Sequence, residues 1–388
     1  MALYEGIALI QEKQAVVLDL GTDYTKFGFT GEAAPRCIIP SEYWCPTERR
    51  FKRVHDYKNE EELYDNLVHM LHLLYFRHVL VNPKERKVVV VESLLTPTLF
   101  RETLAKVLFL HYEVSGVMWA DSARMCALTL GAPVVLVVSL GARDAEVVAV
   151  VHGCPVLQAL QSQPLGARAL HDELARLLDR DHGAELHLPE RVLEDIKARA
   201  CFVPSRQRAL QLAGAGGEGG AAGVTPARGV VYTLAERSLL VSGAARELAA
   251  EPLFARDNEL ASLPDIVLQC IALCPIDARR ELAANILLTG GGAALPGLRA
   301  RLAQELRHLV TLPPYSDRLR IGEFKFHSAP AHENCAAWLG GALCGAADGG
   351  ARALARDAFV RARRVADWPS LLHTTPPAHP HWAALASD

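Results

Sequence analysis

The chain has 388 residues, half of them hydrophobic, which is enough to build two domain-sized cores. Its formal net charge is only −3 and its acids and bases are interspersed, so we expect no broad basic face for nucleic acid or anionic lipid. No apolar run reaches the roughly 18 residues that a membrane span needs, so the composition predicts a soluble globular protein.

Two apolar strand-and-turn segments, residues 15–21 and 135–141, are the most informative motifs. In the first, a buried strand ends near Asp19, a turn begins at Gly21, and Lys26 lies in the return strand. Glycine lets the backbone approach a phosphate, lysine neutralises its charge, and a carboxylate can hold a hydrated Mg²⁺. One such hairpin is more often an ordinary turn. Its repetition favours a two-sided phosphate clamp in which only the first copy keeps an acidic residue.

The rest of the chain alternates between predicted strands and helices. In order they are helix 60–80, strand 88–91, helix 98–112, strand 117–119, hairpin 134–138 with 146–151, helices 170–178, 189–202 and 277–284, strand 286–289 and helix 296–306. This alternation predicts an α/β architecture with helices on the faces of the sheets.

Two glycine-rich stretches have different predicted roles. Residues 213–223 are nearly all Gly and Ala and cannot build a core, which predicts a flexible surface loop. No lysine followed by Ser or Thr closes this loop, so it is not expected to bind phosphate. Residues 290–292 follow a strand and precede a helix, where backbone N–H groups can meet a nucleotide. A plain strand-to-helix turn is the alternative there.

Cysteine usage and the N-terminus indicate the cytosol. The nine cysteines form no Cys-x-x-Cys pair, and the first residues lack the basic and apolar segments of a signal peptide. Cys270 and Cys274 are one helical turn apart and could form half of a metal site. Burial in a packed helix is the favoured interpretation, because a free cysteine behaves as a small hydrophobe.

Four segments resemble the actin family, in the same order and at similar spacing. They are Asp19–Arg36, Leu193–Val203, Thr289–Gly297 and Trp338–Gly341. The first is similar to the first phosphate loop of actin, including its trailing Gly-Glu-x-x-Pro-Arg. The resemblance covers nearly the whole chain. It implies an actin-like fold, with two related ribonuclease-H-like α/β domains around a nucleotide cleft, each carrying a smaller outer subdomain.

The resemblance also implies domain boundaries. The first half would be residues 1–129 with 336–388, its outer subdomain at about 41–60; the second half would be 130–335, its outer subdomain at about 165–257. Only about 20 residues separate Pro40 from the helix near Glu60, fewer than actin uses, so outer subdomain 2 should be much reduced. In actin this subdomain carries the loop that contacts the next filament subunit.

Seven residues match the nucleotide site that the resemblance implies. They are Asp19, Gly21, Thr22, Lys26, Lys197, Gly290 and Gly291. Asp19 would contact a metal ion only weakly, through water. Lys197 matches a lysine that contacts the base, and the two later glycines match the turn on the adenosine side.

Five residues depart from that site: Asp23, Ser122, Ser139, Arg143 and Ala198. Asp23 replaces a glycine and would repel phosphate unless a cation intervenes. Ser139 replaces the second cation-associated acid, Arg143 a glycine beside the γ-phosphate, and Ala198 a ribose-contacting glutamate. Ser122 stands where the family orients the attacking water with glutamine. We expect no enzymatic hydrolysis, with ATP and Mg²⁺ either bound as an unhydrolysed structural ligand or absent.

Further segments resemble the family members at the pointed end of the dynactin filament. They are residues 57–64, 74–83, 195–203 and 274–279. This implies a cytoplasmic, cytoskeletal subunit that caps the pointed end and scaffolds the other pointed-end subunits, in support of dynein-driven microtubule transport. The implied partners are those subunits and the actin-related and actin subunits of the filament, with dynein and cargo reached indirectly, and no nucleic acid. A slow actin-type ATPase, a sugar-kinase-like enzyme and a nuclear actin-related protein of a chromatin complex are the alternatives.

Two segments each allow two interpretations. The charged run Glu48–Arg53 is either a solvated face or a partner site. The tail Trp368–Trp382 is either a loosely packed terminus or a docking strip.

Overall fold

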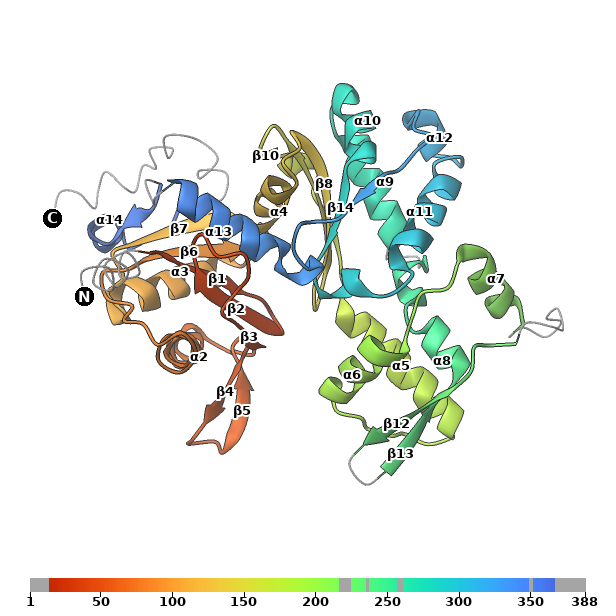
Figure 1. Ribbon diagram of the computed structural model, residues 1–388, viewed down its shortest axis with the longest axis horizontal. Coiled ribbons are helices and arrows are strands. Elements are labelled where there is room, and N and C mark those ends of the chain that lie inside the picture. The colour runs from red at the N-terminus through yellow and green to blue at the C-terminus, as the bar shows by residue number, and fades with distance from the viewer. Residues whose placement is uncertain (1–13, 216–224, 235–236, 257–260, 349–351, 367–388) are drawn as a thin grey trace, which may run out of the picture. The chain divides into compact units, whose positions relative to one another are not determined.

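The computed structural model describes residues 14–215, 225–234, 237–256, 261–348 and 352–366 (Figure 1). The chain divides into two compact units: unit 1 is Met1–Thr129 with Pro330–Asp388, and unit 2 is Leu130–Ala329. The predicted tail strip 368–382 lies outside the described residues. Among the described helices, none is both long and apolar enough to cross a lipid bilayer.

The described part of unit 1 is built on a six-stranded sheet in the order β16-β7-β6-β1-β2-β3. Its strands are β1 (Val16–Leu20), β2 (Tyr24–Phe29), β3 (Cys37–Pro40), β6 (Lys87–Glu92), β7 (Gly116–Asp121) and β16 (Leu354–Ala355). Strands β1, β6 and β7 pair parallel to one another. Strand β2 pairs antiparallel with β1, β3 antiparallel with β2, and β16 antiparallel with β7. The predicted first hairpin and central strand 88–91 are confirmed.

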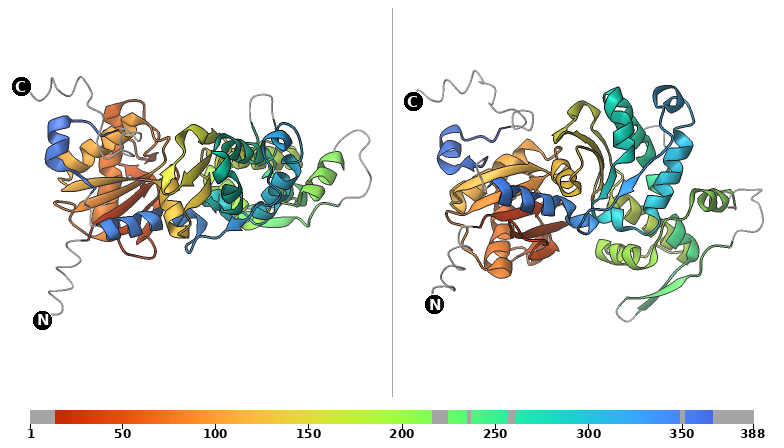
Figure 2. Two further views of the ribbon diagram at one scale, coloured as in Figure 1. Left: turned by 90° about the horizontal axis from the view of Figure 1, so that it is seen from above. Right: turned by 45° about the horizontal axis from the view of Figure 1, so that its top comes forward.

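Alternate residues of the central strands face two helical layers. Val88 and Val90 of β6 lie in a core with α2 (Glu60–Leu73) and α3 (Thr98–Lys106). Val89 and Val91 face the other way and pack with Trp338 of α13 (Ala336–Asp348). Figure 2 shows these helices around the strands of unit 1 from two further directions. The period-two alternation therefore places apolar side chains on both faces of a covered sheet.

The remaining elements of unit 1 lie around this sheet. They are the hairpin β4 (Glu42–Cys45) and β5 (Arg50–Arg53), the π-helical turns η1 (Leu74–Val79) and η2 (Val107–His111), α4 (Ser122–Leu130), η6 (Glu333–Cys335) and α14 (Arg356–Ala362). The turns η1 and η2 continue α2 and α3, so the predicted helices 60–80 and 98–112 each end in a wider turn. Asn59 begins α2, because its side-chain oxygen accepts a hydrogen bond from the Glu62 N–H at 2.8 Å.

Unit 2 contains the second hairpin. In its described part, the sheet order is β10-β9-β8-β14-β15, with β11 paired to β9. The strands are β8 (Val134–Leu140), β9 (Ala145–Val151), β10 (Cys154–Pro155), β11 (Gln161–Gln163), β14 (Ile286–Thr289) and β15 (Phe326–His327). A separate hairpin joins β12 (Val230–Leu234) to β13 (Arg237–Val241). The predicted strands 134–138, 146–151 and 286–289 are confirmed.

Helices of unit 2 bury one large core with this sheet. They are η3 (Leu157–Ala159), α5 (Ala167–His182), α6 (Glu190–Ala200), α8 (Gly243–Leu248), η4 (Glu251–Leu253), α9 (Leu263–Leu273), α10 (Ile276–Ala284), η5 (Gly291–Ala294), α11 (Leu298–Leu309) and α12 (Tyr315–Arg318). Helix α7 (Arg206–Ala215) lies outside this core and contacts α11. The predicted loop starts later than expected, because residues 213–215 are the last part of α7; residues 216–223 lie outside the described residues. Cys270 and Cys274 are both buried at the end of α9, as the packing interpretation expects, and all nine cysteines are free thiols.

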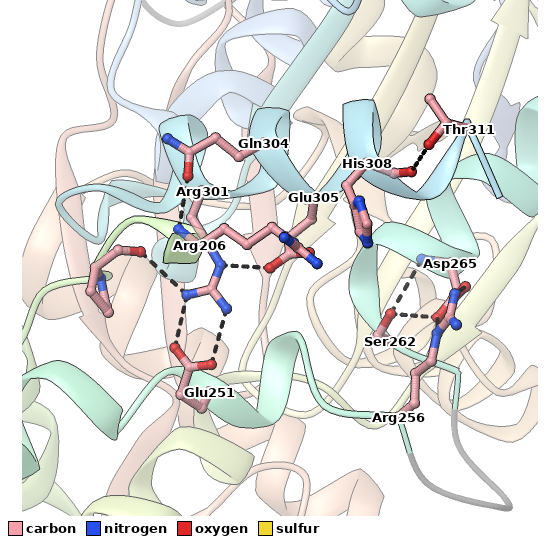
Figure 3. A network of polar contacts seen from close by, with 11 residues as sticks. Arg206, Glu251, Arg256, Ser262, Asp265, Arg301, Gln304, Glu305, His308 and Thr311 are labelled. Carbon is pink, nitrogen blue, oxygen red and sulfur yellow. Dashed lines mark hydrogen bonds and ion pairs between the residues drawn. The ribbon is translucent and has the colours of Figure 1, made fainter. Parts of the chain in front are cut away.

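A buried ion-pair network ties α11 to η4 and α7 (Figure 3). The Arg301 guanidinium donates to both Glu251 carboxylate oxygens, at 3.0 and 3.1 Å, and to Glu305 at 2.7 Å. Arg206 donates to the other oxygen of Glu305 at 3.0 Å. Because the Arg301 side chain is only 4% exposed, the two carboxylates replace the water that this charge would otherwise need.

Candidate functional site

The predicted site residues fall into two groups, one in each unit. In unit 1, Asp19 lies near the end of β1, directly opposite Lys26 in the register with β2. Lys26 Nζ donates a hydrogen bond to Asp19 Oδ2 at 2.8 Å, and their side chains are 11% and 16% exposed. The pair sets the orientation of the carboxylate at the turn. The structure thus brings together the anion and the cation that the sequence assigned to a metal ion and a phosphate.

The turn after β1 needs a glycine and is held by contacts from the segment that follows β3. A Cβ at Gly21 would lie 2.7 Å from the Tyr24 carbonyl oxygen, so the turn has no room for a side chain. The Gly21 carbonyl accepts hydrogen bonds from Ser41 Oγ at 2.6 Å and is 3.1 Å from His55 Nε2. Thr22 lies in this turn. The segment that follows β3 therefore holds the turn in place, which sequence reasoning did not foresee.

Asp23 has a cationic neighbour that the sequence did not indicate. Arg53 Nη1 of β5 is 3.8 Å from Asp23 Oδ1, and the two side chains are 30% and 18% exposed. The expected repulsion between Asp23 and a phosphate is therefore opposed by a guanidinium from within the chain. The neighbouring Lys52 contacts Glu48 and Glu62, both at 2.9 Å. Part of the charged run is thus engaged in intramolecular ion pairs and is not simply a solvated face.

A buried carboxyl lies beside Ser122, the first residue of α4. Asp121 is 2% exposed and accepts hydrogen bonds from the N–H groups of Ala123 at 2.9 Å and Arg124 at 3.3 Å. Burial raises the pKa of Asp121 to about 6, although these two bonds act in the opposite direction. Sequence reasoning missed this residue. The available signal was an acid between a strand and a helix, which is the ordinary position of a helix N-cap.

Asp121 is one of several acids at the same sheet edge. Asp19, Glu92 and Asp121 each lie at or near the end of a neighbouring parallel strand, with Glu92 and Asp121 in register. Glu92 pairs with Arg101 at 2.5 Å, and both side chains are buried. Within the described residues, no group of three or more His, Cys, Asp or Glu is arranged to hold a metal ion. Asp19, the carboxylate that the sequence assigned to a hydrated Mg²⁺, already accepts a hydrogen bond from Lys26 through its Oδ2.

In unit 2, the second hairpin and the predicted glycine turn lie at one sheet edge. Ser139 of β8 is in register with Thr289 of the parallel strand β14. Gly290 has a φ of 88°, and a Cβ there would lie 2.3 Å from the Leu140 carbonyl oxygen. Only glycine fits that backbone and that approach. A Cβ at Gly291 would meet no atom within 4 Å, so space is open beside this residue.

The tip of the second hairpin is bound to the beginning of α5. The backbone N–H groups of Gly166, Ala167 and Arg168 donate to the carbonyls of Arg143, Gly141 and Ala142, at 3.0, 2.9 and 3.0 Å. These N–H groups are ones that a helix leaves without an internal partner. The hairpin uses them itself, so this helix start does not offer them to a phosphate.

Lys197 lies against a neutral histidine. Its Nζ is 2.9 Å from His171 Nε2, and His171 is 2% exposed. Burial and the Lys197 charge lower the pKa of His171 to about 4, against the opposing effect of Glu190. The neutral ring can therefore accept a hydrogen bond from the lysine ammonium. The next residue, Ala198, offers no polar side chain to a ribose.

Known proteins resemble this chain over most of its length. Residues 10–350 match the family model described as "Actin". A protein described as "Actin-related protein 10" from Dictyostelium discoideum is 25% identical, in an alignment covering 86% of this chain and 83% of that protein. "Actin-related protein 2" from Arabidopsis thaliana is also 25% identical, over 86% of this chain and 92% of that protein. The family match spans both hairpins and every site residue compared above.

Proposed function

The chain belongs to the actin family, and we propose that it is a non-catalytic subunit of dynactin. In this proposal it caps the pointed end of the actin-related filament and scaffolds the other pointed-end subunits. The observation that carries the proposal is the stretch between β3 and α2, in which the described chain forms only the short hairpin β4–β5. An end cap needs one face that docks on a filament and no large loop that recruits a further subunit.

The side chains on the inner face of this hairpin contact α2 of the same unit. Tyr43 Oη donates to Asn66 Oδ1 of α2 at 2.8 Å, and its ring stacks on His69 at 4.8 Å between centroids. Lys52 adds the ion pair with Glu62. A hairpin held in this way covers α2. It leaves no long loop of the kind with which actin contacts the next filament subunit, as the proposal expects.

The residues around the phosphate turns support an inert site. Phosphoryl transfer depends on positioned cations and a positioned water. Ser139 replaces the second acid that the family associates with the cation, so this chain lacks a negative charge that would help to position it. The turn at Gly21, together with Asp19 and Lys26, still fits a phosphate with hydrated Mg²⁺. Bound ATP with Mg²⁺ would contact this turn as a structural ligand.

Partners and location follow from the same proposal. The protein would contact the actin-related and actin subunits of the filament and the other pointed-end subunits, and would reach dynein and cargo through them. It would act in the cytoplasm, on the cytoskeleton, in microtubule-based transport. The similarity to a protein described as "Actin-related protein 10" supports this choice within the family, as do the pointed-end-like segments of the sequence.

A slow actin-type ATPase is the competing function, and Asp121 is the observation that favours it. A buried carboxyl with a pKa of about 6 could accept a proton near neutral pH. However, both of its oxygens already accept hydrogen bonds from the first turn of α4. Its local role as an N-cap accounts for its position without catalysis.

Nucleotide content and turnover separate these functions. The purified full chain is denatured and the released small molecules are separated by chromatography, while phosphate release is followed on the native protein. We predict ATP or no nucleotide, with phosphate release at the level of buffer. Mostly ADP together with turnover above buffer would overturn the inert site. A Lys26→Met variant serves as a control, since it should reduce the recovery of any ATP that the first turn holds.

A further inference from the structure

The outer face of the β4–β5 hairpin carries two large aromatic side chains. Trp44 and Phe51 are cross-strand partners, and their rings meet edge to face at 5.3 Å and 73°. They are 52% and 58% exposed. Because side chains alternate along a strand, the neighbouring Tyr43 and Lys52 point to α2 while this pair points away from it. We call Trp44 and Phe51 the aromatic face.

The hairpin is positively charged within a chain that is slightly acidic. Residues 42–53 contain four basic and two acidic side chains, against a net charge of −3 for the whole chain. Lys52 and Arg53 are turned toward Glu62 and Asp23. Arg49 is exposed in the turn, and Arg50, the first residue of β5, pairs with Glu48 at 2.6 Å while its side chain is 66% exposed. Two exposed guanidinium groups, one of them paired with Glu48, therefore lie at the tip of the hairpin.

The hairpin is also firmly supported. Its inner face is fixed by the hydrogen bond from Tyr43 to Asn66 and by the ion pair from Lys52 to Glu62. Its end is fixed to the first phosphate turn, since the Ser41 N–H donates to the Asp23 carbonyl at 2.8 Å. A surface that is already ordered loses little conformational entropy when a partner binds. Figure 1 shows the hairpin at the margin of unit 1, where a partner could reach it.

We propose that the aromatic face is a docking surface for an acidic segment of a partner protein, with an apolar side chain that packs on Trp44 and Phe51. Aromatic and arginine side chains supply much of the energy in protein interfaces, and the two exposed guanidinium groups at the hairpin tip would attract an acidic partner. This deepens the proposed function and rests on it for the identity of the partner, which would be a pointed-end subunit. The surface itself rests only on the hairpin.

Site-specific photocrosslinking in cells tests this proposal. A benzophenone amino acid replaces Phe51 in the full chain, and the crosslinked peptides are sequenced. Leu240 of β13, which is 52% exposed, is the matched control position. We expect Phe51 to crosslink to one segment rich in Asp and Glu. The double variant Arg49→Glu/Arg50→Glu should lower the yield about tenfold. Arg199→Glu, at an exposed arginine of α6, should leave the yield unchanged.

The outcomes separate this proposal from the proposed function. An acidic segment of a dynactin pointed-end subunit supports both, whereas an acidic segment of a protein outside dynactin supports the docking surface alone. Crosslinks no stronger than those at Leu240, or to segments that are not acidic, overturn the docking surface. If the chain still copurifies with dynactin in that case, the proposed function stands. A Trp44→Ala variant with an unchanged melting temperature should also lose the crosslink.

Discussion

At the scale of single residues, the surroundings of His171 determine its charge. Its folded-state pKa is about 4 and its ordinary value is 6.5, so the unfolded chain binds this proton at higher pH. The group therefore stabilises the fold fully above about pH 6.5, and this stability is lost as the pH falls toward 4. Within that window, each pH unit changes the free energy of unfolding by up to about 1.4 kcal/mol.

Replacing His171 should therefore change how stability depends on pH. We predict that His171→Gln flattens the loss of unfolding free energy between pH 6.5 and 4.5, as measured by urea denaturation. His187→Gln is the matched control, because His187 is 82% exposed. Equal slopes for the wild type and His171→Gln would show that His171 is not held neutral in the fold.

Asp121 depends on pH in the opposite direction. Its folded-state pKa of about 6 lies above the ordinary 3.8, so its proton binds more readily in the folded chain, and its contribution becomes more favourable as the pH falls below 6. At pH 7.5, Asp121→Asn keeps a capping oxygen without the buried charge. We predict that it is at least as stable as the wild type, whereas Asp121→Ala loses about 1 kcal/mol. Thermal unfolding measures both variants, and equal losses would exclude the capping role.

Only part of the site could be predicted from sequence. Asp19, Gly21 and Lys26 belong to one hairpin, so local spacing was enough to place them together. The partners of Asp23 and Lys197 come from other elements, with Lys197 and His171 separated by 26 positions. Such contacts depend on tertiary packing, and no local pattern encodes them.

At the scale of elements, Arg301 is the clearest test of what holds unit 2 together. The Arg301→Met variant keeps most of the side-chain volume but leaves Glu251 and Glu305 without their shared cation. We predict a loss of about 3 kcal/mol of unfolding free energy, measured by chemical denaturation. Arg299→Met is the control on the same helix: Arg299 is exposed and hydrogen-bonds to Ser328, so its loss should stay within about 0.5 kcal/mol. Similar losses for both variants would contradict a structural role for the network.

Elements differed in how well their sequences predicted them. Long helices and central strands followed their hydrophobic periodicity. The two-residue strands β10, β15 and β16 have too few residues to show an alternation. The hairpin β4–β5 was hidden for another reason: Lys52 occupies a position on its packed face, so its segment reads as a charged run.

At the scale of the whole molecule, the predicted alternation of strands and helices is confirmed, and the family match establishes the actin-like fold. The pairing of β8 with β14 joins strands that lie on opposite sides of most of unit 2 in the sequence. Periodicity could not have predicted that pairing.

We propose that this chain is a non-catalytic end subunit of dynactin. Affinity purification through a tag on the full chain, followed by mass spectrometry and by electron microscopy of the labelled complex, tests this role. We predict dynactin subunits in constant proportion and one label per filament, at the pointed end. Recovery of chromatin remodellers without dynactin, or labels along the filament, would contradict it.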